Sequence, residues 1–141
     1  MLFNVPADLT RERIEAQSYI DRQIGQARAM FITLSPGQEA VYALKLSEAQ
    51  MIAADRQQGL NVPEGETPLI TAEAAEDGVS RFEKAAEILT CDQHWRVGSQ
   101  MIEALRRSAT TALKAAKTAP EIRAAYAIEW QAVRAFAHSY R

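Results

Sequence analysis

The chain has 141 residues, of which 48% are hydrophobic and 24% are charged, and its formal net charge is -2. This composition predicts one folded domain with a hydrophobic core. No apolar run approaches the roughly 20 residues that cross a bilayer, and the first residues lack the basic flank and apolar core of a signal peptide. We therefore expect a soluble protein made in the cytoplasm, without a membrane partner. The single Cys91 excludes an internal disulfide.

The charge is distributed unevenly. Residues 1–58 hold 6 basic and 7 acidic groups, residues 59–92 hold 2 and 8, and residues 93–141 hold 8 and 3. An acidic middle and a basic end would suit two segments that face each other, within one chain or between copies, or a basic end that binds nucleic acid. Ordinary solvated helix faces account for the same charges, and we prefer that interpretation.

The first helix is predicted over residues 9–34, with Asp8 as its N-cap. Its apolar residues recur every three or four positions, the spacing of one helix face: Ile20, Ile24, Ala27, Phe31 and Leu34. Gly25 interrupts this helix at a cost of about 1 kcal/mol relative to alanine. It either marks a close helix contact or is simply tolerated.

A tight corner is predicted where the second helix begins. Ser35 is the expected N-cap, Pro36 the first helical residue, and Gln38 the side chain that completes a capping box across Gly37. Helices one and two should then form a hairpin. The second helix is expected to end near Gln58, closed by Gly59, and to bury one side consisting of Ala40, Val41, Leu44, Ala49, Met51 and Ile52.

Three further helices are predicted after a loop at residues 59–67. The third begins at Pro68 and stops at Gly78, and a Ser80-x-x-Glu83 capping box opens the fourth, which runs to about residue 117. We expect a kink in the fourth helix near residues 90–93 or 98–99, with a break as the alternative. Thr118-x-x-Glu121 opens a last helix that reaches the C-terminus with one face made of Ile122, Tyr126, Trp130, Val133, Ala137 and Tyr140.

The predicted fold is all-α, an elongated helical hairpin or bundle of five to six helices without a sheet, because no alternating run of β-branched residues occurs. It forms a single helical domain over residues 1–141. Alanine-rich faces permit close helix approach, as in helical oligomers. The candidate interface residues are the large aromatic side chains along these helices: Phe31, Tyr42, Trp95, Tyr126, Trp130 and Tyr140.

The sequence contains few candidates for chemistry. Cys91 and His94 share a helix face and would suit a thiolate–imidazole pair or two metal ligands, but a lone Cys-x-x-His lacks the other ligands of a zinc site. A small buried thiol beside a surface histidine is the preferred interpretation. No glycine-rich phosphate loop or paired catalytic carboxylates occur. We therefore expect no enzyme activity, no metal and no cofactor.

A candidate basic patch surrounds the end of the fourth helix and consists of Arg106, Arg107, Lys114, Lys117 and Arg123. A helix-turn-helix module needs a short recognition helix after a tight turn, and the sequence has no such segment with basic and amide groups on its outer side. Trp95, Tyr126, Trp130 and Tyr140 do not alternate with basic residues as a stacking platform would. Nucleic-acid binding is therefore not favoured.

One family resemblance covers about residues 14–130. It rests on Ile20-Asp21, Ala27-Arg28, Phe31-Ile32-Thr33, Pro36-Gly37-Gln38, Tyr42, Lys45 and Glu48-Ala49, and continues through Pro68-Leu69-Ile70, Ala72-Glu73-Ala74, Gly78, Ala85-Ala86, Ile88-Leu89, Trp95, Ile102-Glu103 and Arg106-Arg107. These residues resemble a family of small uncharacterised helical proteins of tailed bacteriophages, encoded near tail and tail-fibre genes. Cys91, His94 and the loop at 61–66 lie outside the pattern.

The resemblance implies a virion part of the tail, baseplate or fibre region, made in the host cytoplasm, or an assembly helper. It brings no catalytic residues. Our leading expectation is a structural protein in several symmetric copies, which binds other phage structural proteins through helix faces. The alternatives are a tail-fibre assembly chaperone and a nucleic-acid-binding or regulatory protein that uses the basic C-terminal third.

Overall fold

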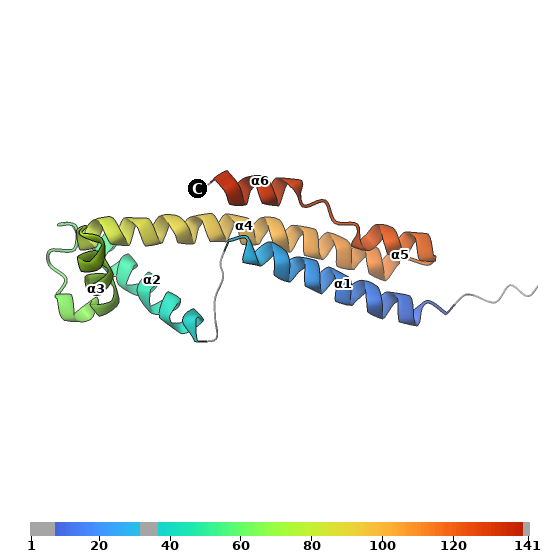
Figure 1. Cartoon of the computed structure of the whole chain (residues 1–141), viewed down its shortest axis with the longest axis horizontal. Helices are drawn as coiled ribbons and strands as arrows, with labels where there is room; N and C mark the ends of the chain where they lie inside the picture. Colours follow the sequence, from blue (N-terminus) through green and yellow to red (C-terminus); the bar gives the residue numbers. More distant parts are fainter. Residues whose placement is uncertain (1–7, 32–36, 140–141) are drawn as a thin grey trace, which may run out of the picture. The chain divides into compact units, whose positions relative to one another are not determined.

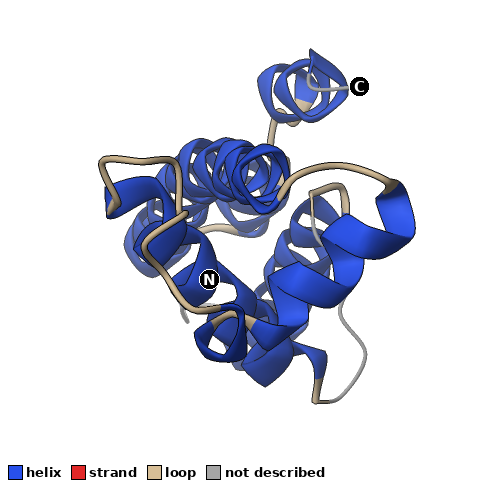
Figure 2. Ribbon diagram, turned by 90° about the vertical axis from the view of Figure 1, so that its left-hand side faces the viewer, coloured by secondary structure: helices blue, strands red, loops and turns tan. Residues whose placement is uncertain are grey.

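The computed structural model describes residues 8–31 and 37–139, and this part of the chain is all-helical. Its elements are labelled in Figure 1: α1 (Thr10–Ala29), α2 (Gln38–Ala54), the 3-10 helix η1 (Glu64–Glu66), α3 (Pro68–Asp77), α4 (Arg81–Ala115), α5 (Ala119–Tyr126) and α6 (Gln131–Ser139). Figure 2 shows helices and loops, with no strand over the described residues. The predicted all-α class without a sheet is confirmed.

The chain packs as two compact units. The terminal unit comprises Met1–Ile32 and Val97–Arg141, and the central unit comprises Thr33–Arg96. Helix α4 contributes its first half to the central unit and its second half to the terminal unit. Each unit has a hydrophobic core of its own, so each is described separately below; the single helical domain stays a prediction.

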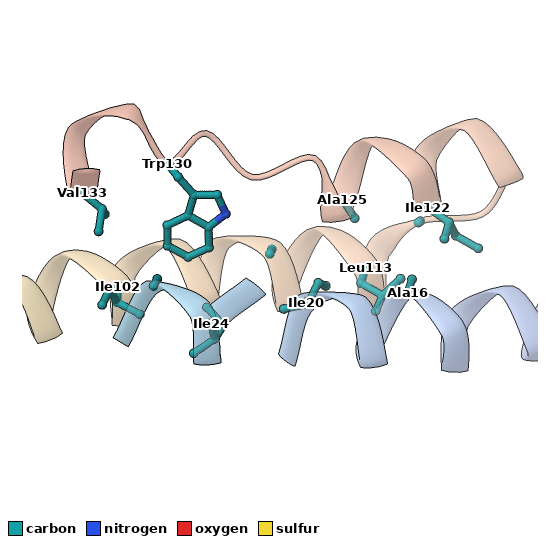
Figure 3. Packing of buried hydrophobic residues seen from close by; sticks show 12 residues of the cluster. Ala16, Ile20, Ile24, Ile102, Leu113, Ile122, Ala125, Trp130 and Val133 are labelled. Carbon is teal, nitrogen blue, oxygen red and sulfur yellow. The ribbon is translucent and has the colours of Figure 1, made fainter. Parts of the chain in front are cut away.

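The core of the terminal unit is formed by four helices and the linker before α6 (Figure 3). The apolar stripe of α1, which includes Ile20 and Ile24, packs with Ile102 and Leu113 of α4. Alanines fill the narrow places, and the remaining core residues are Ala16, Ala27, Ala109, Ala116, Ile122, Ala125, Trp130 and Val133. Burying a side chain the size of isoleucine contributes about 1.5–3 kcal/mol. The predicted stripe of the first helix is therefore confirmed over these residues.

The core of the central unit is smaller. Ala49 and Ile52 of α2 meet Ile70 of α3 and, from α4, Ala85 and Ile88. The predicted buried side of the second helix was wrong for its other large residues: Val41, Leu44 and Met51 are exposed by 43%, 58% and 38%. Relative to the predicted orientation, α2 is rotated about its axis, so that the buried Glu48 lies on the inward side together with Ala49 and Ile52.

The predicted corner between the first two helices differs from the structure. Helix α1 ends at Ala29 and α2 begins at Gln38. Gly37 is the N-cap, with φ +90°, and no side chain caps this helix end. The left-handed backbone that glycine adopts easily sets the start of α2, and Gln38 is its first helical residue. Ser35 and Pro36 lie outside the described residues, and the predicted hairpin stays a prediction because its helices belong to different units.

The second helix is also shorter than predicted at its other end. It stops at Ala54, and Gly59, although left-handed, lies in the loop that follows. The carboxylate of Asp55 accepts hydrogen bonds from the backbone N–H groups of Gln57, Gly59 and Asn61 at 3.2, 2.9 and 3.3 Å. These bonds give the backbone a favourable alternative to another helical turn.

The Ser80 capping box forms in full, whereas the Thr118 box forms only its cap bond, because the carboxylate of Glu121 accepts the backbone N–H of Lys117 at 2.7 Å instead. Glu83 N–H donates to Ser80 Oγ at 3.1 Å, and Ser80 N–H donates to a carboxylate oxygen of Glu83 at 3.4 Å. Glu121 N–H donates to Thr118 Oγ1 at 3.3 Å. Helix α3 also ends as predicted, with left-handed Gly78 as its C-cap.

The last two predicted helices need correction. Helix α4 is a single α-helix from Arg81 to Ala115, without the alternative break and two residues shorter than expected. The predicted last helix is two helices, because residues 127–130 are not helical. This linker brings Trp130 into the core (Figure 3). The indole N–H of Trp130 donates to Gln23 Oε1 at 2.9 Å. Packing of this one large side chain outweighs the helical pattern of the segment.

Candidate functional site

A groove of the terminal unit lies between α1 and α5. It encloses about 590 Å³, and its lining includes Tyr19, Tyr126 and Ile122. The two tyrosine rings meet edge to face with centroids 5.1 Å apart, and the Arg22 guanidinium lies 5.7 Å from the centre of the Tyr19 ring. The charged lining residues are Glu12, Glu15, Arg22 and Arg123. The groove therefore combines an aromatic floor with charges of both signs.

A glutamine fixes the end of this groove. Gln23 Nε2 donates to the backbone oxygen of Tyr126 at 2.9 Å, while Gln23 Oε1 accepts the bond from Trp130. One side chain thus ties α1 both to the end of α5 and to the linker before α6. The sequence offered no signal for Gln23, because both partners lie more than 100 positions away.

A buried carboxylate of the central unit, Asp92, has two hydrogen-bond donors around it. Asp92 is only 7% exposed, and Tyr42 Oη donates to its Oδ1 at 3.0 Å. Arg96 Nε donates to Asp92 Oδ2 at 2.6 Å. Burial raises the pKa of Tyr42 to about 12, and the hydrogen bond to Asp92 and its negative charge add to the effect. A tyrosine held neutral in this way is a structural hydrogen-bond donor rather than a base.

Two more side chains organise the central unit. Glu48 accepts the backbone N–H groups of Ile70 and Leu69 at 3.0 and 3.4 Å, and so caps the start of α3 from α2. Arg81 donates to Thr67 Oγ1 at 2.8 Å and to the carbonyl oxygens of Gly59 and Val62 at 2.7 and 2.8 Å. Sequence analysis missed both, since neither residue has a local partner that spacing would show.

Lys84 of α4 is buried beside two carboxylates. Lys84 is 5% exposed, and its ammonium group pairs with Asp77 and with Glu87, the latter at 3.1 Å. These hydrogen bonds raise the pKa of Lys84, so the group stays charged at all ordinary pH values. The pair with Asp77 joins the end of α3 to α4, whereas the pair with Glu87 lies within α4.

The candidate interface aromatics are not gathered on one surface. Trp130 is buried in the core of the terminal unit, and Tyr126 is half-buried in the groove. Phe31 is half-buried beside Phe136, with ring centroids 6.0 Å apart. In the central unit the Tyr42 hydroxyl donates a hydrogen bond to Asp92, and Trp95 is half-buried. Tyr140 lies outside the described residues.

The candidate basic patch is divided as well. Arg106 pairs with Glu103 through Nε at 2.8 Å, and this bond lowers the pKa of Glu103. Arg123 lines the groove together with Glu12 and Glu15. Arg107, Lys114 and Lys117 are exposed. Two of the five basic groups therefore lie beside carboxylates, which reduces the field that a phosphate backbone would meet.

Arg13 caps α4 from α1. Its guanidinium donates to the backbone oxygen of Leu113 at 2.7 Å and to that of Ala116. A cation at the C-terminal end of a helix stabilises the exposed carbonyl groups there. Spacing along the sequence could not reveal this contact, which joins residues 100 positions apart.

The preferred interpretation of Cys91 and His94, a buried thiol beside a surface histidine, differs from the structure, in which both residues are half-buried and have interaction partners. Within residues 8–31 and 37–139, no three His, Cys, Asp or Glu side chains are grouped so as to hold a metal ion. None of the helices in the same residues has the length and apolar character needed to span a membrane. Comparison with protein families, with curated proteins and with solved structures gives no match to this chain.

Proposed function

We propose that this chain is a non-enzymatic structural protein of a tailed-phage virion, in the tail, baseplate or fibre region. It would act by binding other phage structural proteins, and further copies of itself, through its helix faces. The proposal begins from the family resemblance of residues 14–130. The all-helical fold is compatible with this proposal, because exposed helix faces can bind other proteins through complementary shape and apolar contacts.

The observation that carries the proposal is the exposed apolar stripe of α2. Val41, Leu44 and Met51 stand three and seven positions apart, which places them on one helix face, and they are exposed by 43%, 58% and 38%. Single exposed apolar residues are ordinary, whereas a row of three along one helix suits a protein contact. Methionine adapts its shape to a partner at little cost.

Mass spectrometry of purified particles of the virus that encodes the chain tests the proposal. We expect the protein at a fixed stoichiometry to tail components and crosslinks from the α2 stripe to one of them. The Leu44→Glu variant should be incorporated into particles at a reduced level. The control variant Gln50→Glu changes an exposed residue of the same helix and should be incorporated at the normal level. Absence from mature particles would overturn the proposal.

The same stripe also fits a tail-fibre assembly chaperone, which covers an apolar fibre surface and then leaves. A chaperone would bind the fibre protein during assembly and be missing from the finished particle. Nucleic-acid binding is less well supported because Arg106 and Arg123 lie beside carboxylates. Duplex DNA binding with a steep salt dependence in fluorescence anisotropy would favour it over both.

A further inference from the structure

Helix α1 exposes a second regular face, on the side away from its core residues. The exposed residues Arg11, Glu15, Ser18, Arg22, Gly25 and Ala29 are spaced alternately by four and three positions. This spacing places all six residues on one face of α1. We call this row the outer seam. Two large exposed apolar residues flank it, Ile14 at 64% and Tyr19 at 44% exposure.

The charged residues of the seam are Arg11, Glu15 and Arg22, and Glu12 lies beside the seam. Glu12 and Glu15 lie in the first half of α1, and Arg22 lies in the second half. Within the described residues Glu12 and Arg22 form no ion pair, and Glu15 pairs only with Arg11, at 3.1 Å between two largely exposed side chains. Such a pair contributes little within one chain and exchanges readily for another.

These charges are complementary to those of a second copy. In an antiparallel pair of α1 helices, Glu15 of each copy lies opposite Arg22 of the other. The two residues are seven positions apart, about 10 Å along the helix axis, in both copies. Both ion pairs therefore form together about a two-fold axis, as an interface between identical subunits requires.

The glycine of the seam supports the same arrangement. A side chain at Gly25 would meet no atom within 4 Å, so packing of its own unit does not require glycine there. Glycine nevertheless costs a helix about 1 kcal/mol relative to alanine. With Ala29 it keeps the end of the seam beyond Arg22 low, which allows a second helix backbone to approach closely there.

We propose that a second copy of this chain docks antiparallel along the outer seam of α1, with Glu15 and Arg22 exchanged between the copies. The inference rests on the proposed function in one respect, since it names the surface through which that protein associates with itself. The tyrosine floor of the adjoining groove extends the contact beyond the seam.

The test is the molar mass of the full-length chain by size-exclusion chromatography with light scattering, across a range of protein concentrations. We expect the unmodified chain to dimerise. Glu15→Arg and Arg22→Glu should each weaken the dimer by at least about tenfold, because each places like charges opposite each other. Arg134→Glu reverses an exposed charge on α6 and should leave the dimer unchanged.

Mixing supplies the sharper result. The Glu15→Arg chain carries two arginines at these positions and the Arg22→Glu chain two glutamates, so an equimolar mixture should form a heterodimer. The double variant should dimerise with itself again. Circular dichroism checks that every variant is folded. A misfolded variant would not form the heterodimer when the two chains are mixed.

A monomeric unmodified chain would overturn this inference, as would a dimer that both charge reversals leave intact. Neither result bears on whether the protein is part of virus particles, because mass spectrometry of the particles tests that proposal independently. Conversely, a dimer with the expected charge rescue in a protein missing from particles would keep the seam and overturn the virion assignment.

Discussion

Glu48 places a carboxylate inside the central unit, where it accepts the first N–H groups of α3. A helix start leaves these donors without intrahelical partners, so a buried one needs a partner from elsewhere. The usual cap position, Thr67, makes no side-chain cap bond because its hydroxyl faces Arg81 instead. The central unit thus replaces a local cap with one from another helix.

We expect Glu48→Ala to lower the free energy of unfolding by about 1–3 kcal/mol, because it leaves two backbone donors without an acceptor. Urea unfolding followed by circular dichroism measures the change. Gln50→Ala, at an exposed position of the same helix, is the control and should stay within about 0.5 kcal/mol. Equal effects of the two substitutions would show that the cap contributes nothing.

Arg81 holds the loop before α3 through three acceptors at once. Lysine carries the same charge but cannot present the planar fork that reaches them, so Arg81→Lys should cost about 2 kcal/mol. Limited proteolysis should show faster cutting within residues 55–67. The control is Arg56→Lys, which changes an exposed arginine of that loop, and an unaltered cutting rate in Arg81→Lys would contradict the assigned role.

The raised pKa of Tyr42 predicts how stability depends on pH. The folded chain holds the phenolic proton up to pH about 12, whereas an ordinary tyrosine loses it near 10. The folded state thus binds more protons than the unfolded state between these values. The contribution is fully present below pH about 10 and is lost as pH rises toward 12.

Urea unfolding across this range should show a steeper loss of stability in the unmodified chain than in Tyr42→Phe. The difference between the two chains cancels the other groups that titrate there. Tyr126→Phe serves as a control because it removes a tyrosine without the Asp92 bond. Parallel curves for all three chains would contradict a raised Tyr42 pKa.

At the scale of single elements, two glycines inside helices behave differently. A side-chain carbon at Gly98 of α4 would lie 2.5 Å from ring carbons of Phe31, whereas one at Gly25 of α1 would meet nothing. Replacement of either glycine by alanine stabilises the helix by about 1 kcal/mol, because alanine has the higher helix propensity. Only the first also forces an aromatic ring to move.

Inserting a methyl group into the packed contact at Gly98 costs about 1–3 kcal/mol. After the helix gain of about 1 kcal/mol, Gly98→Ala should destabilise the chain by up to about 2 kcal/mol in thermal or urea unfolding. Gly25→Ala should stabilise it by about 1 kcal/mol, measured in the Arg22→Glu background to keep the copies apart. A stabilising Gly98→Ala would mean that the Phe31 ring yields freely.

Sequence patterns predicted the elements whose signals are local. The Ser80 capping box, the Thr118 cap, the Gly78 stop and the α1 stripe depend on residues three or four positions apart, and all are present. The patterns failed where distant residues decide. On α2, Val41, Leu44 and Met51 are exposed, while Glu48 joins Ala49 and Ile52 on the buried side. Asp55 ends this helix early, and Trp130 interrupts the last helix.

The candidate site was less accessible to sequence reasoning. The aromatic and basic residues named from the sequence are real features, but the structure distributes them between core, groove and surface. Tyr126 and Arg123 do share the α1–α5 groove, to which sequence reasoning had not connected Tyr19 or Arg22. Grooves depend on which helices become neighbours, and that was not encoded in any local spacing.

At the scale of the molecule, the two units predict two cooperative groups of amides in hydrogen exchange. Glu48→Ala should accelerate exchange in α2, α3 and the first half of α4, under mildly denaturing conditions. The segment from Ile102 to Leu113, whose buried residues belong to the other core, should keep its rates. Uniform acceleration along the whole of α4 would show one cooperative unit.

The contact between Arg13 and the end of α4 also concerns synthesis on the ribosome. Arg13 leaves the ribosome 100 residues before Leu113, which at about 5–20 residues per second is a delay of about 5–20 s. The central unit is one continuous stretch of chain, whereas the terminal unit needs both ends. We therefore expect the central unit to fold first. Until the end of α4 has been synthesised, the apolar stripe of α1 stays exposed to solvent and depends on the cell for protection from aggregation.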